Sequence, residues 1–203
     1  MSKTIDSFSG KYDFLSNFYM HEVDYEGKRY PSTEHAYQAA KSLDPAEREK
    51  VRKARSAGHS KKLGRNIKLR TDWESVKVDV MRTVVREKFK SPRLKQMLLD
   101  TGKAKLVEGN HWGDTYWGVC KGRGKNWLGK VLMEIRKELS VANDAFVNAV
   151  LKMDSPEEKL ERIRNILFPI AKRFYNDAPD MIKVPKSEMA ALHVLVINNK
   201  NWK

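Results

Sequence analysis

The chain contains a single cysteine, Cys120, among its 203 residues. One thiol cannot form an intramolecular disulfide or supply a cysteine-rich metal site, so neither device is expected to hold this fold together. The five histidines are scattered along the sequence, and His35 has no clustered metal-ligating partner. The sequence therefore predicts no metal and no cofactor, and the scarcity of cysteine is typical of a protein of the reducing cytoplasm.

Long hydrophobic runs are also missing. No segment approaches the roughly 20 apolar residues needed to span a bilayer, and Met1–Asp6 lacks the apolar core of a signal peptide. Hydrophobic residues still make up 40% of the chain, with five Trp, seven Tyr and seven Phe, which is enough to build a core. We therefore expect a soluble, cytoplasmic protein of one ordinary domain with a small addition, and no membrane partner.

Negative charge is in deficit, because 40 Lys and Arg outnumber 26 Asp and Glu for a formal net charge of +14 at pH 7. The excess is local: residues 41–90 hold sixteen Lys or Arg against seven Asp or Glu, whereas residues 141–203 hold ten against eight. Such a basic segment favours a polyanionic partner, such as nucleic acid or a substrate that carries a pyrophosphate. From charge alone, a basic surface that is merely solvated remains the alternative.

The most informative stretch is residues 31–41, which begins Pro-Ser-Thr-Glu-His. Proline disfavours a helical residue before it, and the serine or threonine after it can cap free N–H groups, which predicts a helix from here to about Leu43. Residues at i, i+4 and i+7 share one face of a helix, so Glu34, Gln38 and Lys41 form a polar row. Either this row lines a polar pocket, or it is a solvated stripe with a Glu–Lys pair.

The remaining patterns up to about residue 108 predict short strands followed by helices. Alternating Val23 and Tyr25 before a Glu-Gly turn predict a β-hairpin, and Gly58 is expected to end a helix. Thr71 and Glu74 match a capping box that opens a long helix, with Thr71 at the N-cap. The other predicted elements are a helix over 45–55, a basic turn or short helix over 59–65, the long helix to about 89, a helix over 92–102 and a strand over 105–108. The predicted fold class is therefore α+β, predominantly helical, with short strands.

A second informative stretch, residues 108–126, combines acidic and aromatic residues with the glycine-rich basic sequence Lys-Gly-Arg-Gly-Lys-Asn. Its last residue, Asn126, is a suitable cap for a helix that we expect to end near Leu139. Backbone N–H groups of such a loop, together with a helix N-terminus, favour a phosphate group. The stretch matches neither a Walker loop nor the dinucleotide fingerprint.

The character of the sequence changes at about Ser140, where the charges become nearly balanced. We therefore divide the chain into a single compact domain of residues 1–140 and a helical extension of residues 141–203. Within the extension the patterns predict helices over 142–153 and 155–175, a loop over 177–185, and a helix or strand over 187–198.

An ordered set of motifs between residues 5 and 139 resembles the NADAR family, also called YbiA-like. The motifs are Phe-Leu-Ser-Asn-Phe at 14–18, Tyr-Pro-Ser-Thr-Glu-His-Ala-Tyr-Gln-Ala-Ala-Lys at 30–41, Lys-Leu-Gly-Arg at 62–65, Asp-Trp-Glu-Ser-Val-Lys at 72–77, Leu-Val-Glu at 106–108, Asp-Thr-Tyr-Trp-Gly at 114–118 and Gly-Lys-Asn-Trp-Leu-Gly-Lys at 124–130. The resemblance implies a compact, mostly helical α+β domain that hydrolyses N-glycosidic bonds. It implies one of two substrate classes: phosphorylated pyrimidine intermediates of riboflavin synthesis, or ADP-ribose attached to guanine in nucleic acid.

The resemblance also implies which residues act. The family's active glutamate, tryptophan and aspartate fall on Glu34, Trp73 and Asp114. Which of the two carboxylates is the general base stays open. The residues expected to bind the substrate, by stacking its base, reading its polar edge or holding its ribose and phosphates, are Asn17, Phe18, Gln38, Lys41, Arg65, Glu108, Trp117, Gly118, Arg123, Lys125 and Asn126.

Three functions are compatible with these observations. The first, which uses both the resemblance and the basic surface, is an N-glycosidase that removes ADP-ribose from a modified guanine in nucleic acid, with DNA favoured over RNA. The second is an N-glycosidase of a phosphorylated metabolite, in which the positive charge captures phosphate. The third is a non-enzymatic module that binds ADP-ribose or nucleic acid, and the intact pair of Glu34 and Asp114 argues against it.

Overall fold

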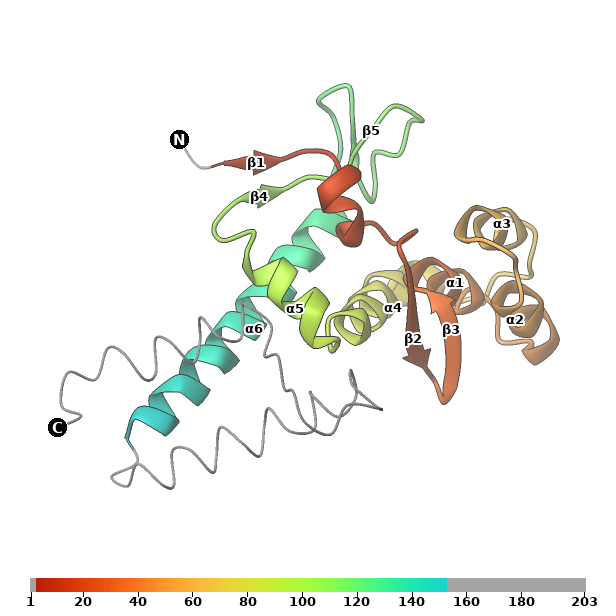
Figure 1. The fold of residues 1–203 in the computed structure, drawn as a ribbon. Coiled ribbons are helices and arrows are strands. Elements are labelled where there is room, and N and C mark those ends of the chain that lie inside the picture. The colour runs from red at the N-terminus through yellow and green to blue at the C-terminus, as the bar shows by residue number, and fades with distance from the viewer. Residues whose placement is uncertain (1–2, 153–203) are drawn as a thin grey trace, which may run out of the picture. The chain divides into compact units, whose positions relative to one another are not determined.

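The computed structural model describes residues 3–152, and the residues up to Glu138 belong to one compact unit. This unit combines helices with three two-stranded sheets (Figure 1), so the α+β, predominantly helical fold class is confirmed. Among residues 3–152, none of the helices is long and apolar enough to cross a bilayer.

Short strands begin the chain. Strand β1, Thr4–Ile5, pairs in parallel with β4, Lys105–Leu106. A 3-10 helix, η1, Gly10–Leu15, leads into a hairpin of β2, Met20–Tyr25, and β3, Lys28–Ser32. The Glu-Gly dipeptide between these strands adopts positive φ at both residues, as a two-residue hairpin turn requires, so the predicted hairpin is confirmed.

Helix α1, Thr33–Ala39, is the element around which its neighbours pack. Its predicted start is confirmed, because Ser32 is the N-cap and accepts a hydrogen bond from the His35 backbone N–H. All residues of α1 are buried, and α2, α3, α4 and the hairpin contact it. The helix ends earlier than predicted, since the N–H groups of Lys41 and Ser42 bond to carbonyls three residues back and tighten the last turn.

Helices α2, Pro45–Arg52, and α3, Ala57–Leu63, follow α1 along the chain. The start of α3 is set by Ser56, whose hydroxyl accepts a hydrogen bond from the His59 backbone N–H at 3.1 Å. Gly58 therefore lies inside a helix, and the prediction that it ends one is wrong. The serine cap outweighs the low helix propensity of a single glycine in the first turn.

Helix α4, Trp73–Lys88, has a different start from the one predicted. Asp72 occupies the N-cap position without a side-chain cap bond, because its carboxylate accepts two hydrogen bonds from the Arg70 guanidinium at 2.6 and 2.9 Å. Glu74 pairs with a lysine one turn later instead of reaching back. The predicted capping box with Thr71 at the N-cap is therefore wrong.

Helices α5, Pro92–Leu99, and α6, Trp127–Leu151, complete the described elements. Two arginines of α4 bind glutamates of α6, and one of these pairs joins Arg82 Nε to Glu134 at 2.8 Å. The largest fully buried side chains are Tyr30, Lys88, Phe89, Leu15, Met81, Leu94, Leu98, Leu106, Leu132, Ile135, His35 and Val23. Lys88 and His35 are the basic members of this set, and the other side chains in it are apolar or aromatic.

Helix α6 runs without interruption past Ser140 to Leu151. The predicted end near Leu139 and the separate helix over 142–153 are therefore wrong as far as the described residues reach. No glycine or proline lies between 130 and 151, so the sequence offers no strong stop signal there. The elements predicted over 155–175, 177–185 and 187–198 lie outside the described residues, and the division of the chain at residue 140 stays a prediction.

The third sheet holds the loop that carries Asp114. Strand β5, Gly109–Asn110, pairs in parallel with β6, Val119–Cys120. The side-chain amide of Asn110 also donates to the Val119 carbonyl at 3.2 Å. The loop between the two strands is therefore tied at both of its ends.

Close backbone packing joins this sheet to the start of α6. A Cβ at Gly118 would overlap the carbonyl oxygen of Glu108, and a Cβ at Gly129 would overlap that of Leu106. The Asn126 side chain accepts a hydrogen bond from the Glu108 N–H at 3.0 Å and donates one to the Leu106 carbonyl at 2.8 Å. These positions allow no larger side chain without moving backbone.

Candidate active site

Glu34 lies on the first turn of α1 with its side chain inside the protein, only 5% exposed. The carboxylate accepts a hydrogen bond from Gln38 Nε2 at 2.8 Å, and the Glu34 backbone N–H donates to the Asn17 carbonyl. Burial raises the pKa of Glu34, against the opposing effects of the Gln38 hydrogen bond and of two nearby lysines. The solvated-stripe alternative is therefore wrong for both Glu34 and Gln38.

The rest of the polar row is held by the end of α3. Gly64, the C-cap of α3, lies against the Gln38 side chain, where a Cβ would overlap the amide oxygen. That oxygen is buried and has no hydrogen-bond partner among residues 3–152. Lys41 Nζ reaches the Gly64 carbonyl at 3.4 Å and lies 5.9 Å from the centroid of the Tyr37 ring. The row predicted from helix spacing thus runs from a buried acid to a partly exposed lysine.

Asp114 is presented by a loop. Its Oδ1 accepts hydrogen bonds from the backbone N–H groups of Tyr116 and Trp117 at 3.0 and 2.8 Å. Its own backbone N–H donates to Asn110 Oδ1 at 3.0 Å, and its carbonyl accepts from Asn110 Nδ2 at 2.8 Å. One carboxylate oxygen is thereby fixed, which leaves the other oxygen to contact a substrate.

Glu108, which the sequence places among the substrate-binding residues, is a third carboxyl group of the site. Burial raises its pKa to about 7, and the charges of Asp114 and Glu34 act in the same direction. Asp114 likewise raises the pKa of Glu34. The Glu108 Oε2 atom is buried and has no hydrogen-bond partner in the described part of the chain. The charge of Asp114 therefore acts with burial to favour the protonated forms of Glu34 and Glu108.

Trp73, Tyr37 and Trp117 form an aromatic cluster that connects the supports of Glu34 and Asp114. The ring centroids of Tyr37 lie 5.2 Å from Trp73 and 5.3 Å from Trp117, the latter in a nearly perpendicular arrangement. Trp73 is 5% exposed, so little of its ring is free for direct contact with a substrate. The cluster fixes α1, the start of α4 and the Asp114 loop against each other.

Two recognition residues from the motif at 14–18 adjoin α1. Asn17 is buried, and its Nδ2 donates to the sulfur of Met81 at 3.3 Å. Its backbone carbonyl is the acceptor for the Glu34 N–H. Phe18 is 42% exposed, and Lys61 Nζ lies 5.5 Å from its ring centroid. Asn17 therefore contacts the backbone of Glu34 directly, and Phe18 is the next residue along the chain.

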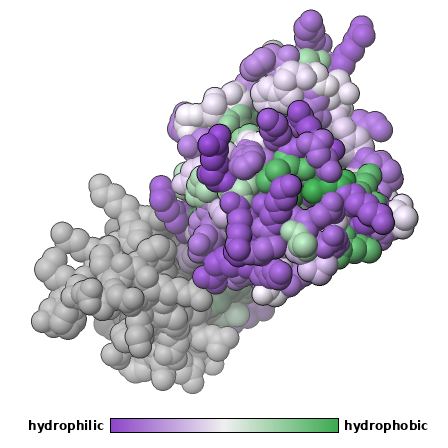
Figure 2. All heavy atoms as spheres, turned by 90° about the vertical axis from the view of Figure 1, so that its right-hand side faces the viewer, coloured by the Kyte–Doolittle hydropathy of each residue, from purple (hydrophilic) through white to green (hydrophobic). Residues whose placement is uncertain are grey.

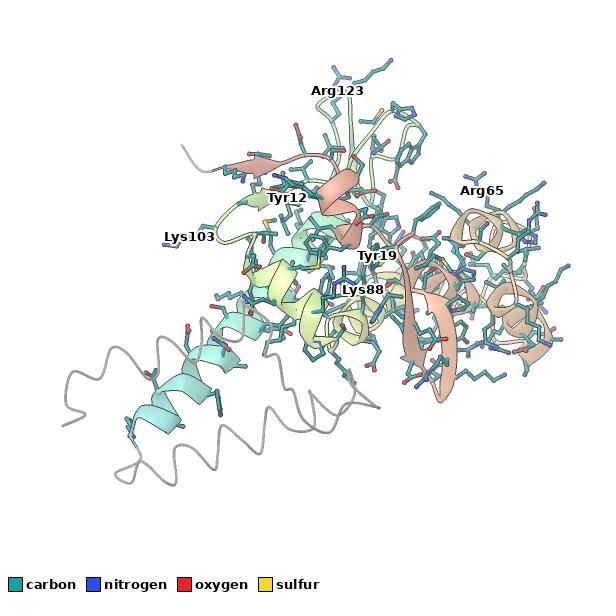
Figure 3. The ribbon with its side chains drawn as sticks, in the orientation of Figure 1. Tyr12, Tyr19, Arg65, Lys88, Lys103 and Arg123 are labelled. Atoms are coloured by element: carbon teal, nitrogen blue, oxygen red, sulfur yellow. The ribbon has the colours of Figure 1, made fainter. Side chains whose placement is uncertain are left out.

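Lys88 is a residue that the sequence interpretation missed. It is fully buried on α4, and its Nζ donates to the Ser16 carbonyl at 2.7 Å (Figure 3). Burial lowers its pKa to about 7, while the charges of Asp13 and Glu108 oppose that shift. The missed signal is its spacing, because Lys88 follows the buried Val84 at i+4 and so lies on the apolar face of its helix.

The other predicted binding residues do not form a single group. Figure 3 shows Arg65 beyond the end of α3 and Arg123 at the tip of the glycine-rich loop, on separate parts of the unit. Lys125 is exposed, with Nζ 5.4 Å from the centroid of the Tyr116 ring. Gly118 and Asn126, as described above, are packed against backbone. Their roles in substrate binding stay predictions.

The face that carries α2 and α3 is mainly hydrophilic, with a hydrophobic patch among the polar side chains (Figure 2). On α3, Lys62 is exposed, and Arg65 follows the helix as another exposed cation. Within residues 3–152, no group of three or more His, Cys, Asp or Glu side chains is arranged to hold a metal ion. His35 instead bridges Ser32 Oγ at 2.7 Å and the Ala54 carbonyl at 3.0 Å, as a buried structural residue.

Comparison with known proteins gives consistent results. The family model of the NADAR domain matches residues 6–140. The N-glycosidase YbiA of Shigella boydii serotype 4 (strain Sb227) is 43% identical over 148 residues, which cover 70% of this chain and 92% of that protein. A riboflavin biosynthesis protein of Vibrio vulnificus (strain YJ016) is 42% identical over 130 residues, which cover 62% of this chain and 35% of that protein. The NMR structure of the Escherichia coli protein YbiA superimposes with a TM-score of 0.64 at 37% identity, covering 77% of this chain and 92% of that one.

Proposed function

The chain belongs to the NADAR family, and from that premise we propose that it is an N-glycosidase that hydrolyses the C–N bond between a ribose and a nitrogenous base. The observation that carries the proposal is the group of interacting carboxyls. Glu34 is buried and Glu108 is half-buried, both with raised pKa values, whereas Asp114 is half-buried and is held by backbone N–H groups. Two environments for neighbouring carboxyls are what acid and base assistance in one site require.

Cleavage of this bond passes through a state with positive charge at C1′ of the ribose. We assign the Asp114 carboxylate to stabilise that charge and to take a proton from the attacking water, because its second oxygen is unoccupied by the loop. We assign Glu34 to donate a proton to the departing nitrogen, because burial favours its protonated form. The water oxygen thus bonds to C1′ as the C–N bond breaks, and the base leaves neutral.

For the substrate, we favour ADP-ribose linked to a guanine in nucleic acid. The net charge of +14 and the exposed cations of α3 next to Glu34 support a polyanionic partner. The charges of Lys41 and Lys61 lower the pKa of Glu34, and cations beside this carboxyl support the binding of a diphosphate there. Phosphates flanking the modified base would meet the outer lysines of α3.

A second substrate class is a phosphorylated intermediate of riboflavin synthesis. The support for it is the similarity to the Vibrio vulnificus protein named for riboflavin biosynthesis. In that case the same cations would capture one phosphate group, and the wider basic surface would have no catalytic role.

The deciding experiment incubates the protein with an ADP-ribosylated oligonucleotide and, separately, with phosphorylated riboflavin intermediates. Release of ADP-ribose at low salt, falling steeply as salt rises, is the expected result, because counterions are released on nucleic-acid binding. Lys62→Glu should weaken turnover of the oligonucleotide, whereas Lys103→Glu, an exposed lysine far from α3 (Figure 3), should not. Release from the metabolite alone establishes the second class, and turnover of neither substrate leaves a binding module.

A further inference from the structure

Two exposed aromatic side chains share one cation beside the active site. Phe18 is 42% exposed and Trp112 is 57% exposed, and they are the aromatic members of the large exposed hydrophobic residues in the described part of the chain. Lys61 Nζ lies 5.5 Å from the ring centroid of Phe18 and 5.9 Å from that of Trp112. A single ammonium group within reach of both rings means that both rings border the same space.

The Phe18 ring is placed by its neighbours in α3 and in its own loop. Its backbone N–H donates to Ser16 Oγ at 3.1 Å. Lys88 Nζ donates a hydrogen bond to the Ser16 carbonyl in the same loop. A Cβ at Gly58 would lie 3.9 Å from the edge of the ring, so the phenyl group lies along α3 between Gly58 and Lys61. The position of Phe18 is therefore set by packing, although much of its surface is exposed.

Trp112 belongs to the same tied loop as Asp114. Asn110 binds both the N–H and the carbonyl of Asp114, and Trp112 lies midway between these two residues. The His111 ring lies 5.2 Å from the Trp112 ring in a nearly perpendicular arrangement. The hydrogen bonds that fix the Asp114 backbone therefore also restrict the loop segment that carries Trp112.

The space between the two rings adjoins the carboxyl groups. Phe18 follows Asn17, whose carbonyl accepts the Glu34 backbone N–H, and Trp112 lies two residues before Asp114. The charge of Lys61 also lowers the pKa of both Glu34 and Glu108. A group that replaced the ammonium between the rings would thus lie next to the carboxyls proposed to act on the C–N bond.

We propose that Phe18 and Trp112 form an aromatic clamp for the base that departs from the ribose, and that Lys61 fills this clamp in the free protein. This inference rests on the proposed function, since the clamped ring is the base at the scissile bond. A planar base presents π-faces to both rings and can replace the cation–π contacts by stacking, which tolerates different bases. The clamp thereby holds the ring while the carboxyls act on C1′.

The test measures binding without turnover, with guanosine 5′-monophosphate and ribose 5-phosphate as probes in calorimetry. Trp112→Leu and Phe18→Leu keep an apolar side chain but remove the π-face. Each should weaken binding of the nucleotide about tenfold, within the range of base–aromatic stacking, and should leave binding of the sugar phosphate unchanged. Trp112→Phe should restore most of the affinity. Tyr12→Leu is the matched control, because the Tyr12 ring also has a cation–π contact, with Lys11 Nζ 5.0 Å from its ring centroid.

Three results would overturn the clamp: nucleotide affinity within twofold of the unsubstituted protein in both leucine variants, equal losses for the two probes, or no nucleotide binding by the unsubstituted protein. The binding test distinguishes a failure of the clamp from a failure of the proposed reaction. A working glycosidase whose leucine variants bind the nucleotide normally has no clamp, and a protein that cleaves no glycosidic bond can still lose nucleotide binding in these variants.

Discussion

Helix α1 and the loop between β5 and β6 present their carboxyl groups in opposite ways. Glu34 is buried on a helix, and a neighbouring side-chain amide binds it. Asp114 is half-buried on a loop, and two backbone N–H groups bind it. Burial favours the neutral acid, whereas N–H groups directed at an oxygen favour the anion. Under the proposed mechanism, the local environment of each group, more than its residue type, would divide the acid and base roles between them.

The strongest test of this comparison is Glu34→Gln, which keeps the shape of the side chain and removes its proton. Turnover should fall about a thousandfold, because a positioned acid contributes on that order, while the fold persists since the change also removes a buried ionisable group. Steady-state kinetics and circular dichroism check both points. Glu22→Gln, at a carboxyl with a side chain 69% exposed, is the control and should behave as the unsubstituted protein. Normal turnover by Glu34→Gln would remove Glu34 from the mechanism.

The loop carboxylate is tested by Asp114→Asn. The amide oxygen can still accept the N–H groups of Tyr116 and Trp117, so the loop should keep its structure while the negative charge is lost. We expect turnover to fall about a hundredfold with little change in thermal stability. Asp114→Ala removes the loop's acceptor as well, and should lower the melting temperature in addition. Equal melting temperatures for the two variants would contradict the role of the backbone bonds.

A smaller effect should follow from Gly64→Ala, which acts on Glu34 through Gln38. The added methyl group would overlap the Gln38 amide and displace its hydrogen bond to Glu34. Turnover should fall roughly tenfold, as expected for a misplaced catalytic group. Gly58→Ala is the matched control within the same helical segment, because its Cβ would have only an ordinary contact at 3.9 Å. Similar losses in both variants would mean that α3 is perturbed as a whole.

The smallest effect concerns the dependence of stability on pH. The pKa of Glu108 is about 7 in the folded protein, against an ordinary value of 4.5. A raised pKa means that its contribution is complete below pH 4.5 and is lost as the pH rises through about 7. Urea unfolding of Glu108→Gln should therefore show a smaller decline in the free energy of unfolding between pH 5 and 8 than the unsubstituted protein. An unchanged decline would mean that Glu108 ionises normally.

Local signals in the sequence were sufficient for several elements and for part of the site. The hairpin before Pro31, the serine cap of α1 and the shared face of Glu34 and Gln38 depend on neighbouring residues, and the structure confirms them. The capping box at Thr71 failed because the helix starts one residue later, with Asp72 at the N-cap, and because Lys77 competes for the Glu74 carboxylate. Local pattern alone does not reveal such a competitor.

The long-range part of the site was harder to predict. The half-buried position of Glu108 near Asp114 depends on segments brought together only by folding, and so does the hydrogen bond from Lys88 to the Ser16 carbonyl. The glycine-rich loop at 121–126 was expected to bind phosphate. Its composition is compatible with either phosphate binding or backbone packing. In the structure, the Asn126 side chain hydrogen-bonds the backbone of Leu106 and Glu108.

The close packing at Gly118 and Gly129 bears on what a family match means. Both glycines belong to motifs by which the chain resembles its family, yet the nearest atom to a Cβ at each position would be a backbone carbonyl oxygen. During divergence, selection at these positions would preserve backbone contact irrespective of substrate. If relatives with different activities keep these glycines, the glycines indicate a shared fold and not a shared substrate. A change of specificity is instead expected at side chains beside the site, such as Lys61 and Trp112.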